Sequence, residues 1–222
     1  MNQPEQNEGH ILLVDKPLEW TSFDVVKKLR YKLKVKKIGH AGTLDPLATG
    51  LLILCTGKKT KVINSIQEQP KEYTGTMVLG KVTASYDLET PVEEGGDTSN
   101  LTENELQNFL PQFTGAIEQT PPIYSAIKVD GKRAYTKARK GEKVELKSRT
   151  VHIYNFELTN IDLPNVKFKV NCSKGTYIRS LVHDFGQAVG CGAYLSELRR
   201  TKIGDFSVED ASSIDDITNE SI

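Results

Sequence analysis

The sequence predicts an α+β fold with a mixed sheet. Stretches typical of strands and of amphipathic helices intermix along the chain, without a regular alternation of strand and helix. Turn-forming Gly, Pro, Asn and Asp residues separate these stretches. The 222 residues, 37% hydrophobic and 26% charged, suit one large domain or two small ones with a sizeable core. No internal repeat is evident.

The first third of the chain predicts two strands and two helices. Residues 9–14 predict a short strand, which Asp15-Lys16-Pro17 ends, and Thr21 and Ser22 are N-cap candidates for a helix over 23–33. The apolar run 51–55 predicts a buried strand, and 58–66 predicts a helix. In the helix over 23–33, a 3–4 spacing puts the apolar residues on one face and the basic residues mostly on the other; these are Phe23, Val25, Val26, Leu29 and Leu33 against Lys27, Lys28, Arg30 and Lys32.

Six further elements and two polar segments follow. Thr102-x-x-Glu105 is a capping-box pattern that predicts a helix up to Phe109, and Gly190 ends a helix that begins near Thr176. The polar C-terminus is expected to fray. The expected order is a strand over 73–79, an acidic Gly-rich loop over 87–100, the helix 102–109, strands over 144–160 and 166–171 around a turn at 162–165, the helix 176–189, a strand over 195–202, and the tail 212–222.

The charges are separated along the chain although they cancel overall. Residues 27–37 hold seven Lys or Arg and no acid, and residues 128–149 hold nine against three acids. Residues 82–127 hold eight acids and the tail after Lys202 holds six, both without Lys or Arg. Clustered charge of one sign can bind a polyanion such as RNA even when the total is zero. A solvated helix face explains residues 27–37 equally well.

Composition also excludes several classes of protein. The three cysteines are widely spaced, which argues against disulfides and a zinc site and predicts small buried side chains. No apolar run is long enough to span a bilayer, and residues 1–9 resemble no targeting signal, so we expect a cytoplasmic protein. A P-loop is excluded, because Leu52 stands where its first glycine is required.

The segment 39–50 concentrates unusual residues. Gly39-His40-Ala41-Gly42-Thr43-Leu44-Asp45-Pro46-Leu47-Ala48-Thr49-Gly50 contains three glycines, a histidine and an Asp-Pro pair just before the apolar run. Proline biases Asp45 away from the α region, so one carboxylate is held in a defined pose. Asp45 is equally well explained as part of a turn or as the N-cap of a helix with Pro46 at its first position.

This segment resembles the active-site motif of the TruB family of tRNA pseudouridine synthases. Five further blocks resemble that family in its order and cover roughly residues 9–211. They are Leu13-Val14-Asp15-Lys16-Pro17 with Thr21-Ser22, then Lys71-Glu72-Tyr73, then 119–128 with Gly131, Tyr135, Ala138-Arg139 and Gly141, then 172–181, and finally 190–195 with Leu198-Arg199-Arg200.

The resemblance implies the pseudouridine synthase fold, a long, mostly antiparallel mixed sheet with flanking helices and a central RNA-binding cleft. It implies isomerisation of uridine-55 in the T loop of tRNA, without cofactor or metal. Asp45 is the implied catalytic carboxylate and Arg179 its cationic partner. The other implied substrate-binding residues are His40, which contacts the RNA loop, Tyr73, Tyr177 and Leu198, which line the pocket of a flipped uracil, and Lys16 and Lys61, which meet phosphates or support the loop.

The predicted organisation is a disordered N-terminus over 1–8, a catalytic domain over 9–211 with a basic RNA-clamping loop over 128–149, and a polar tail over 212–222. A C-terminal PUA-type RNA-binding domain, common in this family, has no room. We expect a monomer that acts on the tRNA T stem-loop without a guide RNA or a membrane. Ala84 departs from the family, in which an acidic residue is common there, and Asp87 keeps a second acidic position.

Overall fold

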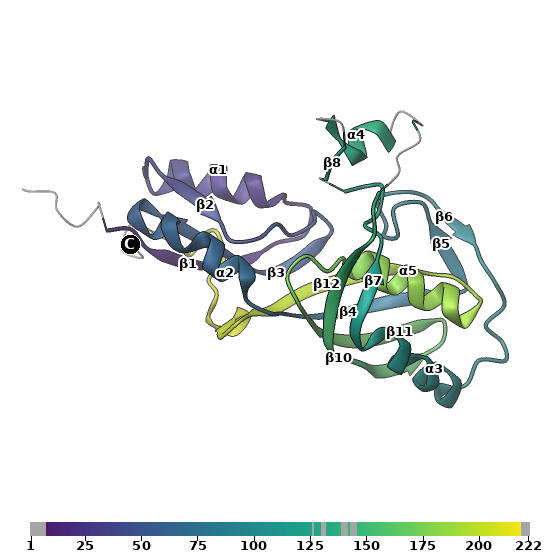
Figure 1. The fold of residues 1–222 in the computed structure, drawn as a ribbon. Coiled ribbons are helices and arrows are strands. Elements are labelled where there is room, and N and C mark those ends of the chain that lie inside the picture. Colours follow the sequence, from purple (N-terminus) through teal and green to yellow (C-terminus); the bar gives the residue numbers. More distant parts are fainter. Residues whose placement is uncertain (1–7, 126, 130–131, 139–141, 143–145, 219–222) are drawn as a thin grey trace, which may run out of the picture. The chain divides into compact units, whose positions relative to one another are not determined.

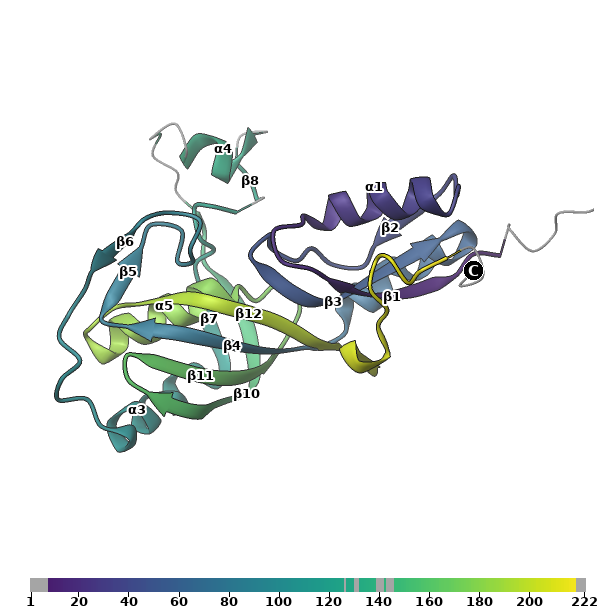
Figure 2. The same cartoon turned by 180° about the vertical axis from the view of Figure 1, so that it is seen from behind.

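The computed structural model describes residues 8–125, 127–129, 132–138, 142 and 146–218. The chain forms two compact units: unit 1 consists of Met1–Thr74 and Leu198–Ile222, and unit 2 of Gly75–Glu197. Strands β4 (Lys71–Leu79) and β12 (Ala193–Ile203) carry the chain from one unit into the other, as can be followed in Figures 1 and 2.

The sheet of unit 1 is built around β3 (Ala48–Thr56). β1 (Ile11–Lys16) pairs antiparallel with β3, so that Leu13 lies opposite Ile53. β2 (Ile38–His40) is also antiparallel to β3, whereas β12 joins it in parallel at Leu198. The short β13 (Phe206–Ser207) pairs antiparallel with β12. These pairings confirm a mixed, mostly antiparallel sheet.

Both faces of β3 are covered, which explains its unbroken apolar run. Leu52 and Leu54 pack in one cluster with α1 (Ser22–Lys32). Leu51, Ile53 and Cys55 pack in a second cluster with Ile66 of α2 (Ile63–Glu68). Where one helix was predicted over 58–66, the structure has two: a 3₁₀ helix, Gly57–Val62, and α2 directly after it.

Helix α1 begins at a capping box in which the Thr21 hydroxyl accepts a hydrogen bond from the Asp24 N–H at 3.0 Å. Val25, Val26 and Leu29 are buried as predicted. The prediction that Phe23 belongs to the apolar face is wrong, because its side chain is 67% exposed. Ser22 takes the buried position at the start of the helix instead.

Unit 2 contains strands in the order β12-β4-β11-β10-β7. Its long hairpin joins β10 (Arg149–Asp162) to β11 (Asn165–Cys172), and β7 (Gly115–Gln119) pairs with β10. The capping box at Thr102 starts α3 (Glu103–Phe109), and Gly190 in the left-handed conformation ends α5 (Ile178–Val189), both as predicted. The two helices and the hairpin meet in an aromatic core of Phe109, Phe113, Phe156, Phe168 and Phe185.

Short elements complete unit 2. The acidic loop predicted over 87–100 contains β6 (Val92–Glu94), which pairs with β5 (Lys81–Thr83). The basic loop 128–149 lies partly outside the described residues; its described elements are β8 (Lys128–Val129), β9 (Lys132–Arg133) and α4 (Ala134–Ala138). Residues 1–7 of the predicted disordered N-terminus also lie outside the described part of the chain.

The described part of the C-terminal segment packs onto unit 1. The Asp15 N–H donates to the Ser212 carbonyl at 2.9 Å, and the Ser212 N–H donates to the Leu13 carbonyl at 3.0 Å. Ile214 and Ile217 are buried in the same cluster as α1. The prediction of a frayed tail is therefore wrong as far as Ile217, because two isoleucines among polar residues are enough to anchor it.

The cysteines and the lengths of the helices also bear on predictions made from composition. Cys55, Cys172 and Cys191 are buried, as predicted. Among the helices that the structure describes, none is long and apolar enough to cross a membrane.

Candidate active site

The loop that carries Asp45 connects β2 to β3 in unit 1. Asp45 and Pro46 form a turn, in which the Ala48 N–H donates to the Asp45 carbonyl at 3.1 Å. No helix starts here, so the alternative of Asp45 as an N-cap is wrong. Gly50, the third residue of β3, has a φ of +99°, and a Cβ there would lie 2.3 Å from the Arg200 carbonyl oxygen. The last glycine of the motif is therefore required by both its φ and this close approach.

A buried hydroxyl holds the residue before Asp45. Ser22 Oγ accepts a hydrogen bond from the Leu44 N–H at 2.9 Å and donates to the Leu44 carbonyl at 3.2 Å. Ser22 and Leu44 are 3% and 4% exposed. Because no water reaches these groups, both polar atoms of the Leu44 backbone depend on this one side chain.

A buried ammonium holds the residue after Asp45. Lys16 Nζ donates to the Pro46 carbonyl at 3.2 Å, and to the carbonyls of Pro17 and Trp20 at 2.8 and 2.6 Å. Its side chain is fully buried. Lys16 therefore supports the loop, and the alternative that it meets phosphates does not fit a side chain without solvent exposure.

A buried guanidinium holds the first part of the loop. Arg200 donates from Nε to the Leu51 carbonyl at 2.8 Å, and from its terminal nitrogens to the carbonyls of Thr43 and Gly42 at 3.2 and 3.3 Å. Its side chain is 1% exposed. A charge buried to this extent is tolerated only when its donors are satisfied, and these three carbonyls accept the hydrogen bonds that it needs.

The two buried cations set the electrostatics of the loop. Burial lowers the pKa of Lys16 to about 8; the charge of Asp45 opposes this shift and that of Arg200 adds to it. Lys16 is thus still protonated at neutral pH. Because the charge of Asp45 raises the pKa of Lys16, the carboxylate and the ammonium interact electrostatically within the loop.

The remaining predicted residues of unit 1 lie in different elements. Tyr73 is in β4 and is 8% exposed. Leu198 pairs with Ala48, three residues after Asp45. Burial lowers the pKa of the half-buried His40, opposed by a hydrogen bond with the Gly42 backbone, so its imidazole is neutral at pH 7. Lys61 is exposed in the 3₁₀ helix before α2 and remains available to a phosphate.

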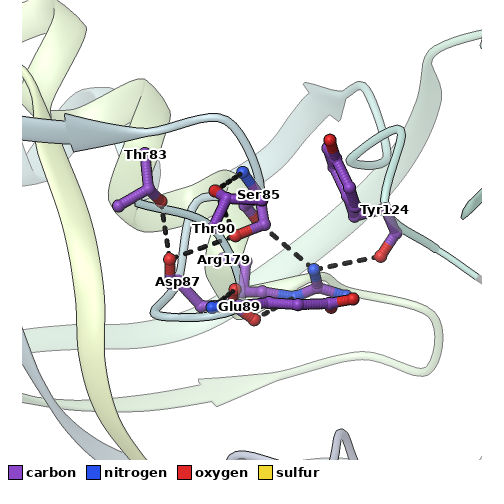
Figure 3. Close-up of polar contacts among 7 residues, drawn as sticks. All are labelled: Thr83, Ser85, Asp87, Glu89, Thr90, Tyr124 and Arg179. Carbon is purple, nitrogen blue, oxygen red and sulfur yellow. Dashed lines mark hydrogen bonds and ion pairs between the residues drawn. The ribbon is translucent and has the colours of Figure 1, made fainter. Parts of the chain in front are cut away.

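Arg179 and Tyr177 belong to unit 2, at the start of α5. Arg179 is 4% exposed and donates to the carbonyls of Ser85 and Tyr124 at 3.2 and 3.1 Å. Its Nε lies 3.5 Å from Asp87 Oδ2, as Figure 3 shows. Asp87 thus forms a buried ion pair with Arg179. Ala84 is exposed in the same segment.

Hydrogen bonds within the segment 83–90 fix Asp87. The Thr83 and Ser85 hydroxyls donate to the Asp87 carbonyl at 2.7 and 3.1 Å, and Asp87 Oδ1 accepts from the Glu89 N–H at 2.9 Å. The Thr90 hydroxyl accepts from the Ser85 N–H at 3.0 Å, and Figure 3 shows these contacts together. Hydrogen bonds within its own segment therefore help to hold Asp87 in the position in which it pairs with Arg179.

Tyr177 is fixed through its backbone. The amide side chain of Gln119, 1% exposed, accepts from the Tyr177 N–H at 2.7 Å and donates to the Tyr177 carbonyl at 3.0 Å. The Arg149 guanidinium lies 5.0 Å from the centre of the Tyr177 ring. The ring is half-buried, so this cation–π contact leaves part of it accessible.

Comparison with known proteins decides the family. The model of the TruB family pseudouridylate synthase N-terminal domain matches residues 30–178, and that of the tRNA pseudouridylate synthase B C-terminal domain matches residues 179–222. The chain belongs to the TruB family.

Relatives within the family match along nearly the whole chain. A tRNA pseudouridine synthase B of Flavobacterium johnsoniae is 54% identical over 96% of this chain and 96% of its own length. One from Phocaeicola vulgatus is 53% identical over 94% and 91%, and one from Clostridium tetani is 48% identical over 96% of this chain and 73% of its own.

Solved structures confirm the pseudouridine synthase fold. A chain in a crystal structure of a Cbf5-Nop10-Gar1 complex superposes with a TM-score of 0.74 at 34% identity, and one in an H/ACA RNP bound to a substrate RNA containing 2′-deoxyuridine with 0.71 at 31%. Each covers 95% of this chain, whereas this chain spans about half of theirs, 53% and 52%.

Sequence reasoning missed three residues that hold the TruB motifs in place. Ser22, Arg200 and Gln119 each stand in a block that resembles the family, and Ser22 is also an N-cap candidate, but the sequence assigns none of them a role in holding a loop. These residues could have been found as polar or charged side chains within stretches that otherwise predict burial, because a buried polar group requires a hydrogen-bond partner. In the described part of the chain, no group of three or more His, Cys, Asp or Glu side chains is placed to hold a metal ion.

Proposed function

We propose that the protein isomerises uridine-55 in the T loop of tRNA to pseudouridine, with Asp45 as the catalytic carboxylate. One observation carries the assignment of Asp45: the backbone on both sides of it is held by buried side chains, Ser22 at Leu44 and Lys16 at Pro46. Membership of the TruB family supports the reaction and the class of RNA. Fixing a reacting group in advance is a main source of catalytic rate.

The reaction breaks the C1′–N1 bond, turns the uracil and joins C1′ to C5, whose proton is lost to solvent while N1 gains one. It is redox-neutral and needs no group donor, so we expect no cofactor. Attack at C1′ and removal of a proton from C2′ both require an ionised carboxylate. Asp45 also interacts electrostatically with the Lys16 ammonium, whose pKa its charge raises.

The target base must leave its stack to reach the carboxylate. Flipping costs a few kcal/mol, which contacts with the flipped base must return. We propose that Tyr73, Tyr177 and Leu198 make these contacts, since aromatic and apolar side chains stack well on a base. His40, neutral at pH 7, is proposed to contact the RNA loop rather than to transfer a proton.

The remaining assignments follow the charges. Lys61, which is exposed, is proposed to meet a phosphate, and the basic loop 128–149 to clamp the RNA. Arg179 as the cationic partner of Asp45 stays a prediction, because the two residues belong to different units. A tRNA substrate makes the cytoplasm the expected site of action, and a monomer stays a prediction that sedimentation would test.

The decisive experiment incubates the protein alone with an unmodified tRNA transcript and maps pseudouridine by position. Product at position 55 is expected, and its absence would refute the function. Asp45→Asn should remove product while tRNA binding persists, because only the reacting charge is lost. The matched control is Asp205→Asn, which removes a carboxylate from an exposed position and should leave activity unchanged.

The similarity to chains in H/ACA complexes supports one alternative, a catalytic subunit that depends on a guide RNA. The same incubation distinguishes the two, since activity on bare tRNA requires neither guide nor partner. A second alternative is an RNA-folding protein that modifies nothing. It predicts tRNA annealing without product and an Asp45→Asn variant indistinguishable from the wild type.

A further inference from the structure

The outer face of α1 exposes two large aromatic side chains. Phe23 is 67% exposed and Tyr31 is 87% exposed. With Lys27 between them they stand at positions i, i+4 and i+8 of one helix, so the three side chains share a face. This face is opposite the buried residues Val25, Val26 and Leu29. Exposed aromatic residues aligned in this way are more informative than single ones scattered over a surface.

The same face carries positive charge. Lys27 is exposed on this line, and Lys28 and Arg30 are exposed on either side of it, with one Arg30 nitrogen donating to the Ile38 carbonyl at 3.3 Å. Asp24 is the single acid of the helix, and its carboxylate accepts from the Thr21 N–H at 3.0 Å and from the Thr21 hydroxyl within the capping box. The uncompensated charge is therefore positive, which favours a polyanion over a neutral partner.

The face starts beside the catalytic loop. Phe23 directly follows Ser22, whose hydroxyl bonds both backbone polar groups of Leu44, the residue before Asp45. Helix α1 and this loop belong to the same unit, and Figure 1 shows α1 lying along the strands of unit 1. From Ser22 the 11 residues of the helix extend for about 16 Å away from the loop.

We propose that Phe23, Lys27, Lys28 and Tyr31 form a binding face for the RNA strand that continues from the target uridine. The inference rests on the proposed function, and it extends the substrate contacts beyond the residues assigned above. Aromatic rings stack on unpaired bases whatever the sequence, while lysines bind phosphates between them. Alternating aromatic and basic side chains along one line match the alternation of bases and phosphates along a strand.

Two double variants separate the two kinds of contact. Phe23→Ser with Tyr31→Ser removes stacking, and Lys27→Gln with Lys28→Gln removes charge. Matched controls are Tyr154→Ser, an aromatic side chain 52% exposed in β10, and Lys167→Gln, an exposed lysine in β11. Binding is measured by fluorescence anisotropy of a labelled T-arm hairpin RNA over a range of salt concentrations. Thermal unfolding checks each fold.

The aromatic variant should raise Kd about tenfold or more at every salt concentration. The lysine variant should lower the slope of log Kd against log salt by about 1 to 2, because two phosphate contacts are lost. Both control variants should bind as the wild type does. Pseudouridine formation by the wild type on the same hairpin reports the proposed function separately.

Each outcome decides one claim. If the wild type forms pseudouridine and both α1 variants bind with unchanged Kd and salt slope, the binding face is refuted while the function stands. If the controls lose as much affinity as the α1 variants, the contacts are not specific to this face and the inference fails. If the wild type binds the hairpin, the α1 variants lose affinity and no product forms, the binding face stands and the proposed function fails.

Discussion

Replacing Ser22 with alanine tests whether the fixed loop matters for catalysis. The substitution removes one oxygen and leaves the N–H and carbonyl of Leu44 without their partner in a position that is 4% exposed. Leaving buried polar groups unsatisfied costs about 1–3 kcal/mol, so the free energy of unfolding should fall by that amount.

The effect on activity follows from the position of Leu44 next to Asp45. Once Leu44 is released, the carboxylate is no longer confined to one pose, and misplacement by about 1 Å lowers rates about 100-fold. We expect kcat to fall about 10- to 100-fold. KM should change little, because no proposed RNA contact is removed. The assay is single-turnover and steady-state pseudouridine formation on a T-arm hairpin.

Thr21→Ala is the matched control. It removes the neighbouring hydroxyl, which caps α1 but does not touch the loop, and should cost about 1 kcal/mol of stability without loss of kcat. Both variants are assayed at a temperature where urea unfolding shows them fully folded. Wild-type kcat in Ser22→Ala, or equal losses in both variants, would refute the positioning argument.

Three further predictions concern buried charges. Arg200→Met should lower the free energy of unfolding, measured by urea titration, by about 3–5 kcal/mol, and it should lower kcat, since carbonyls of the loop lose their donor. Its control is Arg199→Met, which breaks a half-exposed pair with an aspartate and should lower the free energy of unfolding by less than about 1 kcal/mol. Asp87→Asn should destabilise unit 2 by about 3 kcal/mol in urea unfolding by leaving Arg179 without its buried carboxylate, and an unchanged midpoint would contradict the ion pair. Burial raises the pKa of Asp184 to about 6, so the unfolded chain ionises first and stability falls as pH rises from about 4 to 6. In the wild type this loss of stability should be about 1–2 kcal/mol after allowing for partial exposure, and it should be absent in Asp184→Asn. Urea midpoints that change equally between pH 4 and pH 7 in the wild type and in the variant would refute the prediction.

The helices and strands were largely predictable because their signals are local. The capping box at Thr102, the glycine that ends α5 and the apolar run of β3 each depend on residues within a few positions of one another. The 3–4 spacing also located the buried face of α1. It failed for Phe23, because Ser22 provides the contact that fixes the start of the helix and the aromatic ring turns outward.

The family, the loop that carries Asp45 and the residue types that the chemistry requires are all evident in the amino-acid sequence. The side chains that hold this loop can be identified only in the folded chain. Ser22 meets Leu44 across 22 positions, and Arg200 meets Thr43 across 157. Such contacts leave no periodic pattern, because each partner is a backbone group that every residue has. Burial, which makes those hydrogen bonds necessary, is a property of the folded chain.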